Sequence, residues 1–367
     1  MTVLATSGPV NGKRPRPDAC TSMTIARAAL RLLLLTLASL ATAAAEELDR
    51  ARFNPILASI VKVEAVTEAG SYSLGSAVAV APGRFVTSCH VTAKAESVAL
   101  LYQGLRWPVR GQRANAGRDL CLLDVPRLAS VAVVPRASAR DLEVGDPVAA
   151  AGYTFGAGLS TQVGTIRALH PIDGGLVLQS ATYFNSGASG GGLFTMDGRL
   201  VGILTFRLKG AEAYYFSIPA DWIDSALAGD DDYRPIAPLP ADAQPFWSQP
   251  VDRLPYFMRA AVLEARRQWA DLAQLAQTWA AAEPGNAESW FVGGDALNQM
   301  DRYADAVPSF RKALELNPRL AVAWLKLGIA ERKLRHFDEV QDIARRLDAL
   351  APELAAELRA GDRDGTH

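Results

Sequence analysis

The sequence predicts a multidomain protein in which an all-β domain is followed by an α-helical repeat array. The first half consists of short apolar runs punctuated by Gly and Pro, with no helical pattern between them. Such runs are typical of a β-barrel or a β-sandwich. The composition then changes at a proline-rich stretch, and beyond it residues recur at intervals of 34. We expect strands over 60–66, 76–80, 84–87, 97–102, 120–125, 147–153, 162–169, 176–180 and 200–206, and a short helix that opens near 219–223.

The overall composition is that of an ordinary globular protein. The chain has 367 residues, a formal net charge of −1 and 49% hydrophobic residues. This length favours two or three domains. The balanced charge gives no reason to expect nucleic acid as a partner. The three cysteines lack C-x-x-C spacing, so we expect neither a zinc site nor a disulfide-rich scaffold. We expect no metal and no cofactor.

The N-terminus has the features of an export signal. Arg27 and Arg31 precede an apolar run over 32–45 that ends in small residues. The run is too short for a confident membrane span. We therefore expect residues 1–45 to be a signal peptide, with Met23 as the alternative start, and the protein to be periplasmic or secreted. An uncleaved membrane anchor is the alternative, and only then would a membrane be a partner.

The region after the proline-rich stretch resembles tetratricopeptide repeats (TPR), whose period is 34 residues. The first unit departs from the pattern, and we interpret it as a capping unit because a terminal repeat must face solvent. The resemblance implies a helical solenoid that binds a protein partner. The positions that recur are Pro250, Pro284, Pro318 and Pro352, then Trp290 and Trp324, then the aromatic residues Trp269, Tyr303 and Phe337.

These patterns divide the chain into five segments, each with its own composition. The helical repeats are expected as three units, over 251–284, 285–318 and 319–352. The segments are a signal peptide over 1–45, the β domain over 46–230, a proline-rich linker over 231–250, the TPR-like repeats over 251–355 and a tail over 356–367.

The run over 185–192 is almost bare backbone, and Ser189 lies at its centre between Gly and Ala residues. A serine nucleophile needs a base for its proton, and backbone N–H groups aimed at the oxygen that becomes negative during acyl transfer. Ser189 is therefore the candidate nucleophile, and the N–H groups of Gly187 and Ser189 are the candidate oxyanion hole. By itself the run also fits a plain glycine-rich turn.

Of the four histidines, His90 is the candidate base. His336 lies inside the helical repeats, His367 is the last residue, and His170 has the sequence context of a surface loop. An acid follows His90 in the chain, because Asp119 leads directly into an apolar strand. Its carboxylate would need a hydrogen bond there to offset desolvation. A histidine N–H is the natural partner, and the carboxylate would fix the tautomer of the ring.

The order of these three residues discriminates between folds. Gly187 to Gly191 also fits the Gly-x-Ser-x-Gly elbow of α/β-hydrolases. That fold needs its acid and then its histidine after the serine. Here His90 and Asp119 both precede Ser189, and strand–helix alternation is missing. We therefore set the α/β-hydrolase interpretation aside.

Several segments in one order resemble a single family. Residues 57–227 are similar to a trypsin-fold serine protease of the HtrA (Deg) group. The resemblance implies two perpendicular six-stranded β-barrels (chymotrypsin/trypsin-like) with the site between them. It gives His90 the role of general base, Asp119 that of orienting acid and Ser189 that of nucleophile. The matching segments are the histidine segment 75–91, the aspartate segment 118–123, the serine segment 179–191 and the closing strands 198–203 and 216–219.

The same resemblance places residues for substrate binding. No acidic residue stands where trypsin-like members select Lys or Arg, so we expect an uncharged side chain in the primary pocket. Tyr183 fits the barrel core equally well. The residues expected to bind substrate are Tyr183 and Phe184 near the primary pocket and Leu204, Thr205 and Phe206 along its wall.

Two cysteines flank the candidate dyad. Cys89 directly precedes His90, and Cys121 comes two residues after Asp119. If His90 and Asp119 touch, the cysteines are brought close together. We hypothesise a disulfide, with two buried free thiols as the alternative. A Cα separation well above 7 Å would rule the bridge out.

Two functional interpretations remain. The first is an exported serine endopeptidase, a hydrolase that cleaves protein or peptide substrates through a Ser-His-Asp triad and an acyl-enzyme, with TPR repeats for a protein partner. The second is a catalytically silent protease-fold scaffold that recruits partners through its repeats.

Overall fold

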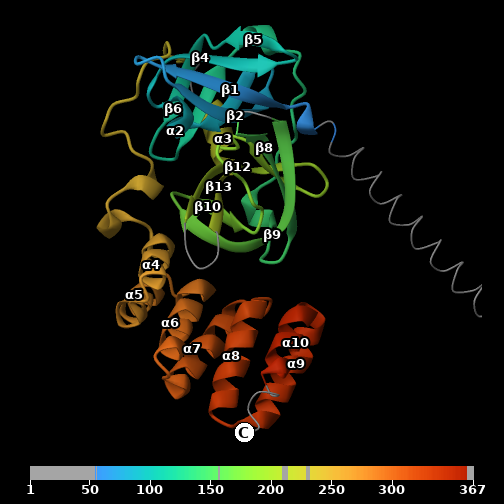
Figure 1. Ribbon diagram of the computed structural model, residues 1–367, viewed down its shortest axis with the longest axis vertical. Coiled ribbons are helices and arrows are strands. Elements are labelled where there is room, and N and C mark those ends of the chain that lie inside the picture. The colour runs from blue at the N-terminus through green and yellow to red at the C-terminus, as the bar shows by residue number, and fades with distance from the viewer. Residues whose placement is uncertain (1–53, 55, 156–157, 209–213, 229–231, 362–367) are drawn as a thin grey trace, which may run out of the picture. The chain divides into compact units, whose positions relative to one another are not determined.

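The computed structural model describes residues 54, 56–155, 158–208, 214–228 and 232–361 (Figure 1). The expected signal peptide lies outside the described residues. Within these ranges, no helix has both the length and the apolar character that crossing a membrane requires.

The first half of the β domain is a seven-stranded antiparallel sheet with the order β5-β4-β1-β2-β3-β7-β6. Alternation explains β1, because Val61 and Val63 are buried while Lys62 and Glu64 between them are partly exposed. The central strand β2 has a continuous buried run instead, so both of its faces are covered over that stretch. The strands are β1 (Ile60–Thr67), β2 (Tyr72–Ala81), β3 (Arg84–Ser88), β4 (Ala95–Tyr102), β5 (Leu105–Pro108), β6 (Gly111–Asn115) and β7 (Leu120–Asp124).

The second half is a closed barrel with the order β10-β13-β12-β11-β8-β9. Its interior is filled by large side chains such as Ile166, Leu178 and Leu193, all fully buried. A short helix, α3 (Asp221–Leu227), follows the last strand, where the sequence predicted a helical opening. The strands are β8 (Pro147–Thr154), β9 (Gly158–Ile172), β10 (Gly175–Ser180), β11 (Gly192–Thr195), β12 (Leu200–Leu208) and β13 (Tyr214–Pro219).

The resemblance implied two six-stranded barrels, and the structure corrects the first of them. Among the described strands, no ladder joins β5 to β6, so this half is a seven-stranded sheet rather than a closed barrel. The edge strand β5 is added to this sheet by a tight hairpin with β4. Its two turn residues, Gln103 and Gly104, both have positive φ, of 51° and 76°, as a type I′ turn requires.

His170 also departs from expectation. The sequence placed it in a surface loop, whereas the structure places it in β9 with 1% of its surface exposed. The strand continues through Ile172, and the Phe257 ring stacks on the imidazole with centroids 3.8 Å apart. The loop interpretation was wrong because the sequence around His170 does not reveal that Phe257, far away in the chain, covers this strand.

A helical region follows the β domain. Three of its helices, α5, α7 and α9, begin at Trp269, Tyr303 and Phe337. The last helix runs to Ala360 and so passes the expected boundary at 355. The helices are α4 (Tyr256–Ala265), α5 (Trp269–Ala282), α6 (Ala287–Gln299), α7 (Tyr303–Leu316), α8 (Ala321–Lys333), α9 (Phe337–Leu350) and α10 (Pro352–Ala360).

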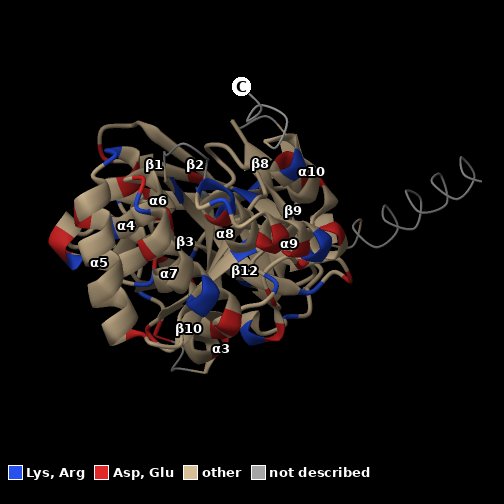
Figure 2. Cartoon of the chain, turned by 90° about the horizontal axis from the view of Figure 1, so that it is seen from below, with Lys and Arg blue, Asp and Glu red and all other residues tan. Residues whose placement is uncertain are grey.

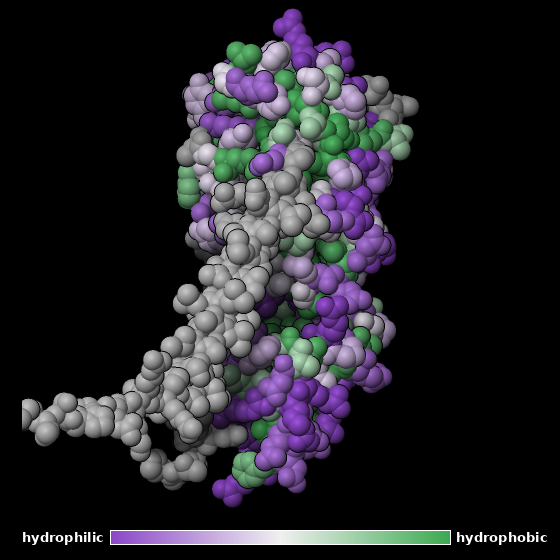
Figure 3. Space-filling model, turned by 90° about the vertical axis from the view of Figure 1, so that its right-hand side faces the viewer, coloured by the Kyte–Doolittle hydropathy of each residue, from purple (hydrophilic) through white to green (hydrophobic). Residues whose placement is uncertain are grey.

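The surface is mixed in charge. Figure 2 shows acidic and basic residues side by side on α9. On the face seen in Figure 3, hydrophilic side chains dominate the helical region, and apolar ones gather over the β domain.

The candidate site is braced by a disulfide between Cys89 and Cys121, whose Cα atoms are 4.9 Å apart. Cys89 begins the four-residue helix α2 (Cys89–Thr92), and Cys121 lies in β7. Both cysteines are buried. The bridge closes a loop with a sequence separation of 32, which restricts the unfolded chain.

We predict that reducing this disulfide lowers stability by about 3 to 4 kcal/mol, as expected for a loop of this size. The unfolding midpoint in denaturant, measured with and without a thiol reductant, checks the value. The Cys89→Ala/Cys121→Ala variant should start from the lower midpoint and show no response to the reductant. An unchanged midpoint in wild-type protein with two newly titratable thiols would contradict the prediction.

A second prediction concerns two neighbouring glycines of α6. A Cβ on Gly294 would lie 2.8 Å from ring atoms of Phe310, which is fully buried, whereas one on Gly293 would lie 3.3 Å from the Cβ of Ala276. Alanine gains about 1 kcal/mol in a helix, but overpacking costs about 1 to 3 kcal/mol. Gly294→Ala should therefore be less stable than Gly293→Ala, as measured by thermal unfolding followed by helical circular dichroism. Equal melting temperatures would contradict this packing argument.

Candidate active site

The centre of the candidate site is a buried carboxylate with three donors. Asp119 has no exposed surface. Its Oδ1 accepts the backbone N–H of His90 at 2.8 Å, and its Oδ2 accepts from the His90 Nδ1 at 2.7 Å and the Trp247 Nε1 at 3.1 Å. These bonds offset the cost of burying the charge. Because the proton on Nδ1 is held by the carboxylate, the lone pair of the ring is on Nε2, where a general base needs it.

The local backbone explains how Asp119 reaches His90. Asp119 has a φ of 56° in the left-handed region, which Asp tolerates better than most residues. Its carbonyl accepts the N–H of Cys89 at 3.1 Å. The ladder between β3 and β7 ends here, where Ser88 pairs with Leu120. His90 thus comes just after β3, and Asp119 comes just before the neighbouring strand β7. The disulfide joins the same two segments.

Ser189 lies in the turn between β10 and β11, and the turn is fixed by Ser76 of β2. The Ser76 N–H donates to the Ser189 carbonyl, and its hydroxyl donates to the Gly187 carbonyl, each at 2.8 Å. That hydroxyl also accepts the N–H of Tyr153 at 2.8 Å. Gly187 and Gly190 have φ of 95° and 86°, values that only glycine adopts readily. A fully buried serine of the first sheet therefore holds the serine turn of the barrel.

The turn leaves the N–H groups of Gly187 and Ser189, the candidate oxyanion hole, available to a substrate. The carbonyls that share a peptide plane with them are engaged: Ser186 O accepts from Phe155, and Ala188 O accepts from Gly191, each at 2.8 Å. A trans peptide directs its N–H away from its carbonyl. Within the described ranges, neither the Gly187 N–H nor the Ser189 N–H has an acceptor. This is the condition that an oxyanion hole requires.

The Ser189 hydroxyl does not bond to the imidazole in this structure. It donates to the carbonyl of Thr205 at 3.3 Å. The serine turn nevertheless lies against the segment that carries His90. Between them stands Gly75, where a Cβ would lie 2.5 Å from Val91 Cγ1 and 3.2 Å from the Ser189 carbonyl oxygen. Contacts between nucleophile and base are often loose in proteins without substrate and tighten when it binds.

The five residues expected to bind substrate have different environments. Tyr183 is 49% exposed and donates to Asn185 Oδ1 at 2.6 Å, whereas Phe184 and Leu204 belong to the buried core of the barrel. The Thr205 backbone accepts from Ser189. Phe206 stacks on Trp247, with ring centroids 5.3 Å apart. Their role in substrate binding stays a prediction.

Sequence reasoning missed Trp247, because residues 231–250 were interpreted as a stiff linker. In the structure, backbone hydrogen bonds instead hold this segment against the first half of the β domain. Leu239 N–H donates to the Ala93 carbonyl at 2.8 Å, and Phe246 N–H donates to the Gly117 carbonyl at 2.9 Å. The signal was two adjacent aromatic residues within a polar, proline-rich stretch.

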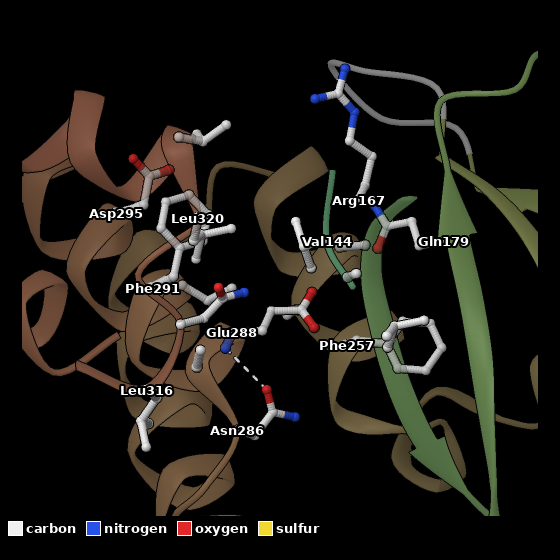
Figure 4. A pocket seen from close by; sticks show the side chains of 18 of the residues that line it. Val144, Arg167, Gln179, Phe257, Asn286, Glu288, Phe291, Asp295, Leu316 and Leu320 are labelled. Carbon is white, nitrogen blue, oxygen red and sulfur yellow. Dashed lines mark hydrogen bonds between the residues drawn. The ribbon is translucent and has the colours of Figure 1, made fainter. Parts of the chain in front are cut away.

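A cavity of about 1950 Å³ lies elsewhere, between the barrel and the helical region. Figure 4 shows Arg167, Gln179 and Val144 on one side and Glu288 and Asp295 on the other. Its lining includes none of the three candidate catalytic residues. Its mixed charges do not select a ligand class.

Comparison with known proteins gives a family match over the β domain and several curated relatives. Residues 75–203 match the family model Trypsin-like peptidase domain. The chain is 29% identical to the serine endoprotease DegS of Haemophilus influenzae over 42% of this chain and 49% of that protein. It is 29% identical to the periplasmic pH-dependent serine endoprotease DegQ of Escherichia coli over 40% of this chain and 35% of that protein. The aligned parts span half or less of these relatives.

Solved structures give matches of the same kind. The Rv3671c protease of M. tuberculosis in its active form is 20% identical, with a TM-score of 0.47 over 52% of this chain and 90% of that one. The serine endoprotease of Yersinia pestis is 28% identical, with a TM-score of 0.42 over 48% of this chain and 65% of that one. The family match and the curated relatives show that part of the chain is similar to trypsin-like peptidases and to serine endoproteases.

Proposed function

We propose that this protein is an exported serine endopeptidase that cleaves protein or peptide substrates through His90, Asp119 and Ser189. The observation that carries the proposal is the pairing of His90 with a buried carboxylate, at 2.7 Å, beside a serine turn with two available amides. These are the parts that acyl transfer needs.

The proposed reaction follows from these positions. The Ser189 hydroxyl turns from the Thr205 carbonyl towards His90 and attacks the scissile carbonyl, while its proton passes to Nε2. The oxyanion is stabilised by the N–H groups of Gly187 and Ser189. The imidazolium, stabilised by Asp119, then gives its proton to the leaving amine, and an acyl-enzyme remains. A water molecule, deprotonated by His90, releases the acyl group and restores the serine.

Export is supported by two independent facts. Relatives such as DegQ of Escherichia coli and DegP of Salmonella typhimurium are periplasmic serine endoproteases. The two cysteines beside the site form a disulfide, which persists in oxidising compartments. We infer that the protein acts in the periplasm or outside the cell, consistent with the signal predicted over 1–45.

We further propose that the helical region is a TPR-type solenoid that binds a protein partner. The starts of α5, α7 and α9 are 34 residues apart, as 303 − 269 and 337 − 303 show. The turns before them contain Arg267, Asp301 and Arg335, which share this interval and have φ of 54°, 57° and 65°. Equal intervals of helices and turns support a repeating two-helix unit.

One observation favours the alternative of a silent scaffold. The Ser189 hydroxyl is bonded to the Thr205 carbonyl rather than to the base. If this arrangement persisted when a substrate is bound, the protease fold would present a cleft without turnover. A chemical probe of the serine distinguishes the two functions.

We predict that a fluorophosphonate probe labels the full-length protein and that Ser189→Ala abolishes labelling, since loss of a triad serine typically costs roughly a millionfold in turnover. The matched control is Ser186→Ala, three residues away in the same turn and exposed, which should still be labelled. Labelling is read by gel fluorescence and mass spectrometry. Absence of labelling in folded wild-type protein would favour the scaffold.

A further inference from the structure

We propose that Trp247, from the segment after the β domain, is a positioning residue of the active site. Its indole N–H donates to Oδ2 of Asp119, the same oxygen that accepts from His90 Nδ1. This inference rests on the proposed function, because it assigns Trp247 the task of orienting the carboxylate that orients the base.

Trp247 contacts both members of the dyad. Its N–H lies 3.1 Å from Oδ2 of Asp119, and its ring meets the His90 imidazole edge to face, with centroids 5.5 Å apart and planes at 88°. Phe206 also supports the indole, because the two rings are stacked with their centroids 5.3 Å apart and their planes at 19°. The indole is therefore held between the strand β12 and the imidazole, and its only polar group meets the carboxylate.

The segment that carries Trp247 is placed by its own contacts. The backbone N–H of Phe246 donates to the carbonyl of Gly117, two residues before Asp119. The Phe246 ring packs edge-on against Phe206 at 5.8 Å and Trp222 at 6.4 Å. Because Phe246 is anchored to the loop that contains Asp119, the next side chain is directed at the carboxylate.

The neighbouring hydroxyl does not supply this donor. Thr205 of β12, whose carbonyl accepts from Ser189, also has a hydroxyl, but its Oγ1 donates to the carbonyl of Ile203 at 2.8 Å. In the described part of the chain, Oδ2 of Asp119 thus has two donors, one from His90 and one from Trp247. Removing the indole N–H leaves a fully buried charged oxygen with one donor fewer. Such a loss is more costly for a charged group than for a neutral one.

The experiment compares Trp247→Phe with Phe246→Leu in the full-length protein. Phenylalanine keeps a ring between His90 and Phe206 but removes the N–H, whereas Phe246→Leu changes the neighbouring ring and keeps both the indole and the backbone N–H that donates to Gly117. A fluorophosphonate probe gives both its binding constant KI and its inactivation rate kinact. We expect Trp247→Phe to lower kinact about tenfold or more with KI nearly unchanged, as expected for loss of a hydrogen bond to a charged group.

A spectroscopic readout is independent of activity. The proton shared by His90 Nδ1 and Asp119 gives a downfield proton NMR signal, which His90→Gln should abolish and so assign. Trp247→Phe should change the frequency of this signal, and Phe246→Leu should leave it at the wild-type position. If Trp247→Phe retains both the wild-type frequency and the wild-type kinact, Trp247 is not a positioning residue.

The two proposals can fail separately. Wild-type protein that shows the downfield signal but is not labelled would refute the peptidase, and the NMR comparison would still test the contact of Trp247. Wild-type labelling together with a wild-type kinact and a wild-type signal frequency in Trp247→Phe would refute the role of Trp247 and leave the peptidase intact.

Discussion

The site depends on keeping one charge, the Asp119 carboxylate, out of water. A bare carboxylate at zero exposure would be too costly, and the fold offsets that cost with three donors: the backbone and the imidazole of His90, and the indole of Trp247. His90, Asp119 and Trp247 are far apart in sequence. Their convergence requires the ladder of β3 and β7, the disulfide across it and the docked segment after the barrel.

A second constraint joins the two halves of the β domain. Ser76 lies in the first sheet, yet both its backbone and its hydroxyl hold the turn of Ser189 in the second. Gly75 beside it leaves room for that turn to approach Val91. The proposed base and the proposed nucleophile therefore belong to different halves, and two adjacent residues of β2 set the distance between them. This is why the sequence run Gly75-Ser76 matters although neither residue carries out chemistry.

Much of this arrangement could be predicted from the sequence because it is local. Alternation located β1, and the turn at Gly83, with a φ of 69°, separated β2 from β3. The order of His90, Asp119 and Ser189 followed from short motifs. The strands that escaped prediction were short, and two of them, β5 and β6, have few apolar residues. The burial of His170 and the docking of Trp247 could not be predicted, because each depends on an aromatic contact between distant segments.

The docked segment also bears on how this chain could be recombined. A boundary drawn at residue 230 looks natural from composition, and a chimera built there would exchange the helices while seeming to spare the enzyme. The indole beside the imidazole would leave with the exchanged piece. The two halves are thus not interchangeable modules, and a transplantable catalytic unit would have to extend at least through Ser248.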